Sequence, residues 1–383
     1  MGKTKSSLFD QIALHGGRKL KNRLVVAPLT RKSATPEGVP TQEMADYYSA
    51  FAKGGFGMII SEGTYTDDLF SQSDLRQPGI TNEAQMLGWQ NVAEKVHRYE
   101  AIFINQLMHA GALGQLREEN IAPSAVQPVG ERSTEVGGAT GPYPLPRAMN
   151  NADFEAVKRG YLQAAMLSRQ AGFDGIEIHA ANGYLFDQFV TEHTNLRTDQ
   201  YGGNVRNRLR FLMEVYQAVR DALPADFIVG IRLSESKVND LKYRWPGGSQ
   251  TASEVFSVLS EIQPDYFHIA SEGGSWKRES LYAEGLSSTG IAKKLTQVPI
   301  IANGGLHDIE LAESLIASDQ ADLISIGRAA IANPDWANRI LNGQDTIPFF
   351  KELIKPSLTL AHTQQVLNQY MQQNAPTVCV YKH

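Results

Sequence analysis

The stretch GIEIHAANGY, residues 175–184, begins as a mainly apolar run and ends in polar residues. Gly175–Ile178 is typical of a strand buried on both faces, since its hydrophobicity is nearly continuous. Similar runs rich in Val and Ile recur along the chain. The predicted strands are Leu24–Leu29, Gly57–Gly63, Ala101–His109, Gly175–Ala180, Phe227–Ser234, Tyr266–Ser271, Pro299–Gly305 and Leu323–Arg328.

Helical patterns, with apolar residues at three-to-four spacing, separate these runs. They cover Asn82–Tyr99, Asp153–Ala171, Asn204–Leu223, Ser253–Ile262, Ser287–Thr296 and His307–Ala317. Eight strand–helix units in series indicate an α/β fold, a closed (β/α)8 TIM barrel, and we predict one domain over residues 1–383. A doubly wound sheet would need a reversal in strand order, which the sequence alone does not exclude.

One connection is far longer than a strand–helix unit needs. It follows the third predicted strand, and its excess, residues 111–150, is dense in Gly and Pro. Long connections in compact domains are usually functional or disordered, so we predict a lid over the C-terminal face of the barrel. Residues 350–383 form a Gln-rich tail with one weak helical pattern, to which we assign no chemistry.

Composition excludes several function classes. A net charge of -5 gives no basic field for nucleic acid. Cys379 is the only cysteine, which excludes internal disulfides, cysteine-ligated zinc and iron–sulfur clusters, and we predict no metal site. The chain contains no apolar run long enough to span a membrane. We therefore expect a cytoplasmic protein without nucleic-acid or membrane partners.

Polar residues stand where the predicted strands end, which is where barrel enzymes place their chemistry. These residues are Thr30, Glu62, Gln106 with His109, His179, Arg232, Ser271, Asn303 and Arg328. For Glu62, His109 and Ser271 taken singly, a structural hydrogen bond is the better explanation. Taken together, the set predicts a polar pocket.

The last two strand ends suggest a phosphate site. Asn303-Gly304-Gly305 and Gly327-Arg328 place glycine amides and a bidentate cation at loops that commonly hold a phosphate in such barrels. The ligand could be a phosphorylated sugar, PLP or FMN. Three further side chains favour a flavin: the Gln106 amide could pair with a pyrimidine edge, the Thr30 hydroxyl could bond a ring carbonyl, and Arg232 could face a reduced, anionic ring. The alternative for Arg232 is a buried ion pair.

The stretch His179–Tyr184 offers two hydrogen-bond donors and one weak acid. His179 and Asn182 could both donate to one ligand oxygen, and Tyr184 could supply a proton nearby. This is what an enzyme that polarises a carbonyl group needs. A strand-end histidine, an Asn-Gly turn and a packed tyrosine would explain the same residues equally well in isolation.

From Lys21 to about Trp336 the chain resembles the Old Yellow Enzyme family of FMN-dependent alkene reductases. The most specific block comprises HAANGYLFDQF at 179–189, NLRTDQYGGN at 195–204 and RNRLRF at 206–211. Supporting segments are KNRLVVAPLTR at 21–31, QLMH at 106–109, APSA at 122–125, GIRL at 230–233 and GRAAIANPDW at 327–336.

The resemblance implies tightly bound, non-covalent FMN at the barrel mouth. Its phosphate would lie at the loops of Asn303, Gly304, Gly305, Gly327 and Arg328, and its ring among Pro28, Leu29, Thr30, Glu62, Gly63, Gln106 and Arg232. NADH or NADPH would be the co-substrate of a ping-pong reaction that reduces the activated C=C bond of an α,β-unsaturated carbonyl compound. His179 and Asn182 would hold the carbonyl oxygen, and Tyr184 would protonate the α-carbon.

The chain departs from the family pattern at two places. Met108 stands where many members have Trp, so we expect altered substrate packing. Asn204 and Arg206 replace the usual Ser and Glu in a segment that we interpret as structural. Alternatives are a related flavin barrel acting on nitro esters, quinones or amines, and a flavin-binding protein without alkene turnover. The sequence is compatible with a monomer or a homodimer.

Overall fold

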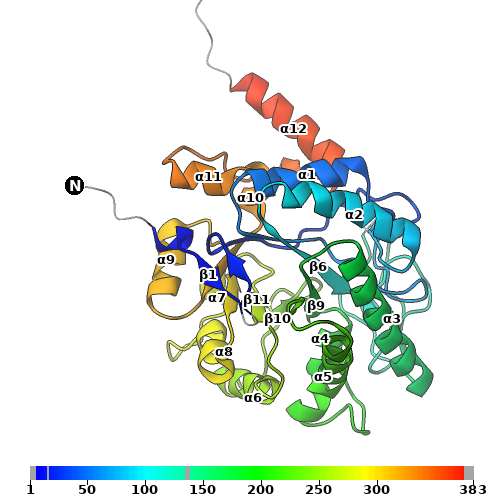
Figure 1. The fold of residues 1–383 in the computed structure, drawn as a ribbon. Helices are drawn as coiled ribbons and strands as arrows, with labels where there is room; N and C mark the ends of the chain where they lie inside the picture. Colours follow the sequence, from blue (N-terminus) through cyan, green and yellow to red (C-terminus); the bar gives the residue numbers. More distant parts are fainter. Residues whose placement is uncertain (1–5, 15–16, 134–138, 375–383) are drawn as a thin grey trace, which may run out of the picture.

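Eight parallel strands close into a barrel in the computed structural model, which describes residues 6–14, 17–133 and 139–374 (Figure 1). Around the barrel these strands are β3 Leu24–Val26, β4 Met58–Ile60, β6 Ile102–Met108, β9 Gly175–Asn182, β10 Ile228–Lys237, β11 Tyr266–Ala270, β12 Ile300–Asn303 and β13 Leu323–Ile326. Pairing of β4 with β6 and of β13 with β3 closes the ring. The (β/α)8 barrel is confirmed, and each predicted strand run overlaps one of these strands, although β9 and β10 extend beyond their predicted ends.

Helices surround the barrel and connect its strands. They are α1 Gln42–Lys53, α2 Glu83–His97, α3 Asn151–Gln170, α4 Leu185–Val190, α5 Val205–Ala222, α6 Ser249–Leu259, α7 Trp276–Glu279, α8 Ser288–Thr296, α9 Ile309–Ala317, α10 Arg328–Ala332, α11 Trp336–Leu341 and α12 Leu360–Gln373. Six of them match the helical patterns of the sequence. Helix α1 was missed, although Thr41 caps it and its apolar face is buried. Nowhere in the described ranges is a helix both long and apolar enough to cross a bilayer.

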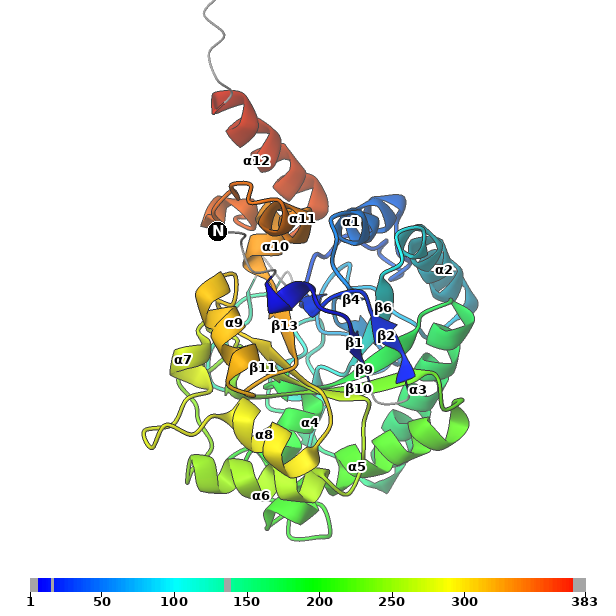
Figure 2. The same ribbon diagram turned by 60° about the vertical axis from the view of Figure 1, so that its left-hand side comes forward.

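Two layers of apolar packing hold the barrel. Ten residues fill its N-terminal half from inside: Leu14, Leu20, Val25, Met58, Ile60, Ile104, Ile228, Tyr266, Ile301 and Leu323. Leu14 and Leu20 come from a hairpin of β1 Ile12–Ala13 and β2 Lys19–Leu20, which lies across that end of the barrel (Figure 2). A larger cluster joins the outer strand faces to the helices. The plug at one end leaves the opposite, C-terminal end for the polar side chains.

The Tyr-Gly-Gly-Asn segment has the structural role that we predicted. The side chain of Asn204 caps α5 by accepting a hydrogen bond of 2.9 Å from the backbone nitrogen of Asn207. An Asn oxygen serves this purpose as well as the Ser hydroxyl that it replaces. Arg206 forms an ion pair with Glu261 across the barrel surface. Asn204 and Arg206, the two replacements in this segment, therefore both have structural partners.

The long insertion and the tail differ in whether they reach the cavity at the barrel mouth. Residues 111–150 contain a short 3₁₀ helix, Gly111–Leu113, and the strand pair β7 Ile121–Ala122 with β8 Arg147–Ala148. None of their described residues lines the cavity at the barrel mouth, so a lid role stays a prediction. The tail contains the 3₁₀ helix Lys351–Leu353 and α12, which projects away from the barrel (Figures 1 and 2). Residues between these two helices do reach the cavity.

Candidate functional site

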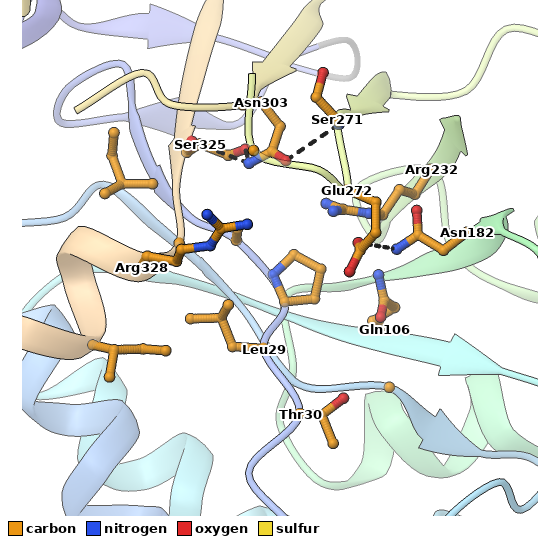
Figure 3. A pocket seen from close by; sticks show the side chains of 18 of the residues that line it. Leu29, Thr30, Gln106, Asn182, Arg232, Ser271, Glu272, Asn303, Ser325 and Arg328 are labelled. Atoms are coloured by element: carbon orange, nitrogen blue, oxygen red, sulfur yellow. Dashed lines mark hydrogen bonds between the residues drawn. The ribbon is translucent and has the colours of Figure 1, made fainter. Parts of the chain in front are cut away.

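A cavity of about 370 Å³ opens at the C-terminal ends of the barrel strands. Fourteen of the fifteen residues predicted for the site line it: Pro28, Leu29, Thr30, Gly63, Gln106, His179, Asn182, Tyr184, Arg232, Asn303, Gly304, Gly305, Gly327 and Arg328. Figure 3 shows how four of these side chains, those of Gln106, Asn182, Arg232 and Asn303, converge from separate strands. The volume is within the usual range of small-molecule and cofactor sites. Closure of the barrel therefore brings together residues that are far apart in the sequence, such as Pro28 and Arg328.

Glu62 is the exception, because it is not among the residues that line the cavity. Its carboxylate accepts hydrogen bonds from the backbone nitrogens of Arg31, at 2.9 Å, and Lys32, at 3.2 Å. The hydroxyl of Tyr48 donates to its other oxygen at 3.1 Å. Glu62 is buried behind the cavity wall and fixes the backbone that follows Thr30. Burial raises the pKa of this carboxyl to about 7.

We expect Glu62→Gln to remove a pH dependence of folding stability. An unfolded carboxyl titrates near pH 4.5, whereas the folded one titrates at about 7. The folded state thus holds this proton more tightly, and the stabilisation is complete below pH 4.5 and lost as the pH rises through 7. The difference corresponds to about 3 kcal/mol. Urea unfolding at pH 4 and pH 8.5 should show that loss in the wild type and not in Glu62→Gln. Parallel pH profiles of the two proteins would contradict this prediction, and Glu94→Gln, at an exposed position of α2, is the control.

The end of β9 is shaped by a left-handed turn. Asn182 has a φ of 63° and Gly183 a φ of 88°, conformations that Asn tolerates and Gly favours. The hydroxyl of Ser234 on β10 accepts a 2.7 Å hydrogen bond from the Asn182 backbone nitrogen. The side-chain amide Nδ2 of Asn182 donates to Glu272 at 2.8 Å (Figure 3). Asn182 is therefore held at both its backbone and its side chain.

His179 and Tyr184 lie beside each other at this turn, with ring centroids 5.1 Å apart in an edge-to-face arrangement. Burial, with the positive charge of Arg232, lowers the pKa of His179 to about 3, so its imidazole is neutral at physiological pH. Burial also raises the pKa of Tyr184 well above its ordinary value of 10. The pair thus offers a neutral hydrogen-bond donor and a phenol that keeps its proton.

A buried polar network supports the floor of the cavity. Glu177 accepts a hydrogen bond from Nε2 of Gln106 at 2.8 Å and lies 3.0 Å from Nδ1 of His268. Arg232 lies 2.9 Å from the same imidazole nitrogen. Burial alone would raise the pKa of Glu177, but His268, Arg232 and Gln106 hold it below its ordinary value. Because its nitrogen faces Glu177, the Gln106 amide is fixed with its oxygen free to accept.

Strand-end loops build the opposite wall. Asn303 ties three of them together, since its Nδ2 donates to the Ser325 hydroxyl at 2.9 Å and its Oδ1 accepts from the Ser271 backbone nitrogen at 3.4 Å (Figure 3). Gly304 has a φ of 117°, and a Cβ there would lie 2.7 Å from the backbone nitrogen of Trp276. Only glycine fits this position. A Cβ at Gly274 would lie 2.8 Å from the Arg328 guanidinium, so the loop after β11 closely abuts that cation.

Sequence reasoning missed several residues that line the cavity. Glu272 and Gly274 stand in the loop after β11, beyond the strand end. Ile354 and Leu358 come from the tail, which is anchored where Arg31 donates hydrogen bonds to the Thr363 hydroxyl and the Thr359 carbonyl. For Glu272 and Gly274, the Gly-Gly pair at 273–274 was an available signal of a functional loop. The sequence carries no comparable signal for the tail.

The cavity fits FMN by its unpaired polar atoms. Among the described residues, His179 Nδ1, Asn182 Oδ1 and Arg232 Nε are buried without a hydrogen-bond partner. Buried polar atoms normally have partners, so these atoms indicate a bound group that supplies them. No described carboxylate forms an ion pair with Arg328, which faces the glycine loops. An unpaired guanidinium beside glycine amides suits a phosphate.

Comparisons with known proteins identify the family of this chain. Residues 7–346 match the model of the NADH:flavin oxidoreductase / NADH oxidase family. A "probable flavin mononucleotide-dependent alkene reductase" of Leishmania infantum is 35% identical over 345 residues, which cover 86% of this chain and 89% of the relative. The Old Yellow Enzyme homologue of Zymomonas mobilis superposes with a TM-score of 0.77 at 31% identity, covering 91% of this chain and 95% of that one. Morphinone reductase in complex with tetrahydroNAD gives a TM-score of 0.78 at 32% identity, covering 89% and 92%.

Proposed function

The chain belongs to the NADH:flavin oxidoreductase / NADH oxidase family, and on that premise we propose that it reduces the activated C=C bond of α,β-unsaturated carbonyl compounds by a ping-pong mechanism. It is an FMN-dependent, NAD(P)H-dependent oxidoreductase related to Old Yellow Enzyme. The observation that carries the proposal is the placement of His179, Asn182 and Tyr184 on one wall of the cavity. Binding a flavin alone needs neither a carbonyl clamp nor an acid.

The two ends of the cavity suit the two ends of FMN. Gly304, Gly305 and Arg328 would hold the phosphate, and Gln106 would accept a hydrogen bond from the edge of the ring. The guanidinium of Arg232 would place a fixed positive charge against the ring. When bound, FMN supplies the hydride carrier between the reduced nicotinamide and the alkene.

Arg328→Ala should weaken FMN binding by about 10- to 100-fold, because hydrogen bonds to a charged group contribute about 1.5–3 kcal/mol. The dissociation constant can be measured from the fluorescence of released FMN on dilution. Arg339→Ala on α11, where the guanidinium pairs with Asp335 outside the cavity, is the matched control. Equal FMN affinity in Arg328→Ala and the wild type would remove Arg328 from the phosphate site.

The substrate wall acts through hydrogen bonds and one proton. The imidazole of His179 and the amide of Asn182 would donate to the carbonyl oxygen of the substrate, which becomes more negative as a hydride reaches the β-carbon. The hydroxyl of Tyr184 would give its proton to the α-carbon. Together with the hydride from NAD(P)H, this proton completes the addition of two hydrogens across the double bond.

The first test is the visible spectrum of the purified holoenzyme under anaerobic conditions. Addition of NADPH should bleach the yellow colour, and 2-cyclohexenone should then restore it. Bleaching without recovery would reject the alkene-reductase proposal and direct attention to nitro compounds or quinones as oxidants. A protein that stays colourless after addition of FMN would contradict flavin binding itself.

A further inference from the structure

Lys237 and Asp187 form a hydrogen-bonded pair next to the turn that leads into Tyr184. Nζ of Lys237 lies 2.6 Å from Oδ1 of Asp187, and the two side chains are only 6% and 1% exposed. Neither belongs to the described residues that line the cavity at the barrel mouth. An effect of this pair on the reaction would therefore have to act through the turn.

Asp187 holds the turn by its backbone. Its Oδ2 accepts a 2.6 Å hydrogen bond from the backbone nitrogen of Gly183, and Nε2 of Gln188 donates to the Gly183 carbonyl at 2.7 Å. Tyr184 is the N-cap residue of α4, and within the described structure its side chain makes no capping hydrogen bond. An acidic side chain at the third helical position commonly reaches back toward the chain that enters the helix. Two consecutive side chains of α4 thus fix both backbone polar groups of the residue directly before Tyr184.

Lys237 fixes the direction of the Asp187 carboxyl group. It is the last residue of β10, where it is in register with Asn182 on β9. Its Nζ also lies 4.5 Å from the centroid of the Tyr243 ring, a favourable position for a cation. Oγ1 of Thr191 donates to the same carboxyl oxygen as Lys237, at 3.3 Å. Because one oxygen of Asp187 is held by these donors, the other is directed toward the turn.

The arrangement does not depend on which member of the pair holds the proton between them. Burial raises the pKa of Asp187 and lowers the pKa of Lys237, and each partner opposes the shift of the other. A carboxyl oxygen can accept the hydrogen bond from Gly183 whether the group is ionised or protonated. A buried ion pair contributes little net stability, because the loss of hydration offsets the attraction. The stability of the barrel therefore does not account for this pair.

We propose that Asp187 and Lys237 are positioning residues that set the place of Tyr184 for proton transfer. The proposal rests on the proposed function, in which Tyr184 gives its proton to the α-carbon of the substrate. The carbonyl clamp of His179 and Asn182 should not need the pair, because Asn182 has its own hydrogen bonds to the strand and loop beside it. The pair should therefore affect the rate of enone reduction far more than the affinity for a ligand oxygen.

The experiment is a double-mutant cycle of Lys237→Met with Tyr184→Phe. Holoenzyme reduced with dithionite is mixed anaerobically with 2-cyclohexenone, and the return of the flavin absorbance gives the rate. Lys237→Met should slow this step by about tenfold or more in the wild-type background, and by less than about twofold in the Tyr184→Phe background. Lys237→Arg, which keeps a donor for Asp187, should recover much of the rate. Lys293→Met, which breaks an ion pair with Asp322 outside the cavity, should leave the rate unchanged.

A binding measurement separates positioning from a general loss of structure. The phenol oxygen of 4-hydroxybenzamide can accept from His179 and Asn182, and its affinity for the FMN-loaded enzyme is measured by calorimetry. This affinity should stay within about twofold of the wild type in Lys237→Met. If Lys237→Met does not fold, Asp187→Asn takes its place in the cycle, because an amide offers one oxygen acceptor where the carboxyl group offers two.

Turnover of 2-cyclohexenone by the wild type separates the two proposals. If the wild type reduces the enone, the proposed function stands. The positioning role is then overturned by equal slowing in both backgrounds, by no slowing, by a parallel loss of 4-hydroxybenzamide affinity, or by a rate that Tyr184→Phe leaves unchanged. If the wild type does not reduce the enone, the proposed function is rejected, and the role of the pair is rejected with it.

Discussion

Tyr184→Phe is expected to slow the reduction of 2-cyclohexenone by about 10²- to 10⁴-fold, the usual contribution of a positioned general acid. The substitution removes one oxygen and keeps the ring against His179, where the centroids lie 5.1 Å apart. Bleaching of the flavin absorbance by NADPH should be unchanged, because that step needs no proton from Tyr184. Stopped-flow absorbance under anaerobic conditions measures the two half-reactions separately.

The pH profile gives an independent check on Tyr184. Burial is the main reason that the pKa of this phenol is raised well above 10, and the negative charges of Asp74 and Glu272 act in the same direction. The hydroxyl therefore stays protonated, and the rate of enone reduction should show no loss from ionisation of Tyr184 between pH 7 and 9. Tyr216→Phe, which changes a buried phenol on α5 outside the cavity lining, is the control. Two unaffected half-reactions in Tyr184→Phe would show that another group supplies the proton.

The barrel could be predicted because its strands are buried on both faces. Runs such as Gly175–Ile178 and Phe227–Leu233 are continuous in hydrophobicity, and they alternate with amphipathic helices. Once the order of elements is known, the C-terminal strand ends must meet at one face. The placement of Gln106, His179 and Arg232 in one cavity followed from topology alone.

The direction of the Glu62 side chain could not be predicted from the sequence pattern. Glu62 lies at a bend just after β4 ends at Ile60, where the alternation of side chains along a strand no longer applies. Gly63 faces the cavity and packs so closely that an added Cβ would lie 2.5 Å from the sulfur of Met108. Glu62 points outward to the backbone of Arg31 and Lys32. Family resemblance identified the segment, but the direction of the Glu62 side chain depends on these tertiary hydrogen bonds.

The contributions of the tail and of the loop after β11 to the cavity could not be predicted from sequence patterns for a different reason. Loops have no periodicity, so the direction of Glu272 depends on its hydrogen bonds to Asn182 and Ser236. Leu358 reaches the cavity only because α12 docks on Arg31, more than 300 positions earlier in the chain. Such long-range contacts are encoded in three-dimensional packing and leave no local signature.

His179→Leu should reduce the rate of enone reduction by about 10²- to 10³-fold, as expected when one donor to a developing oxyanion is lost. Leucine fills most of the imidazole volume, so the change removes the donor more than the packing. The structure indicates which form of the histidine acts. Burial and Arg232 lower the pKa of His179 to about 3, so a neutral imidazole donates throughout the physiological range.

This assignment makes two linked predictions for His179. The rate should show no inflection from His179 between pH 5 and 8, because the imidazole becomes charged only near pH 3. His179→Asn, which keeps an N–H donor, should recover part of the activity lost in His179→Leu, and the affinity for 4-hydroxybenzamide should follow the same order. If the leucine variant binds this phenol as tightly as the wild type, His179 does not hold the substrate oxygen. The carbonyl would then depend on Asn182 alone, whose amide is already shared with Glu272.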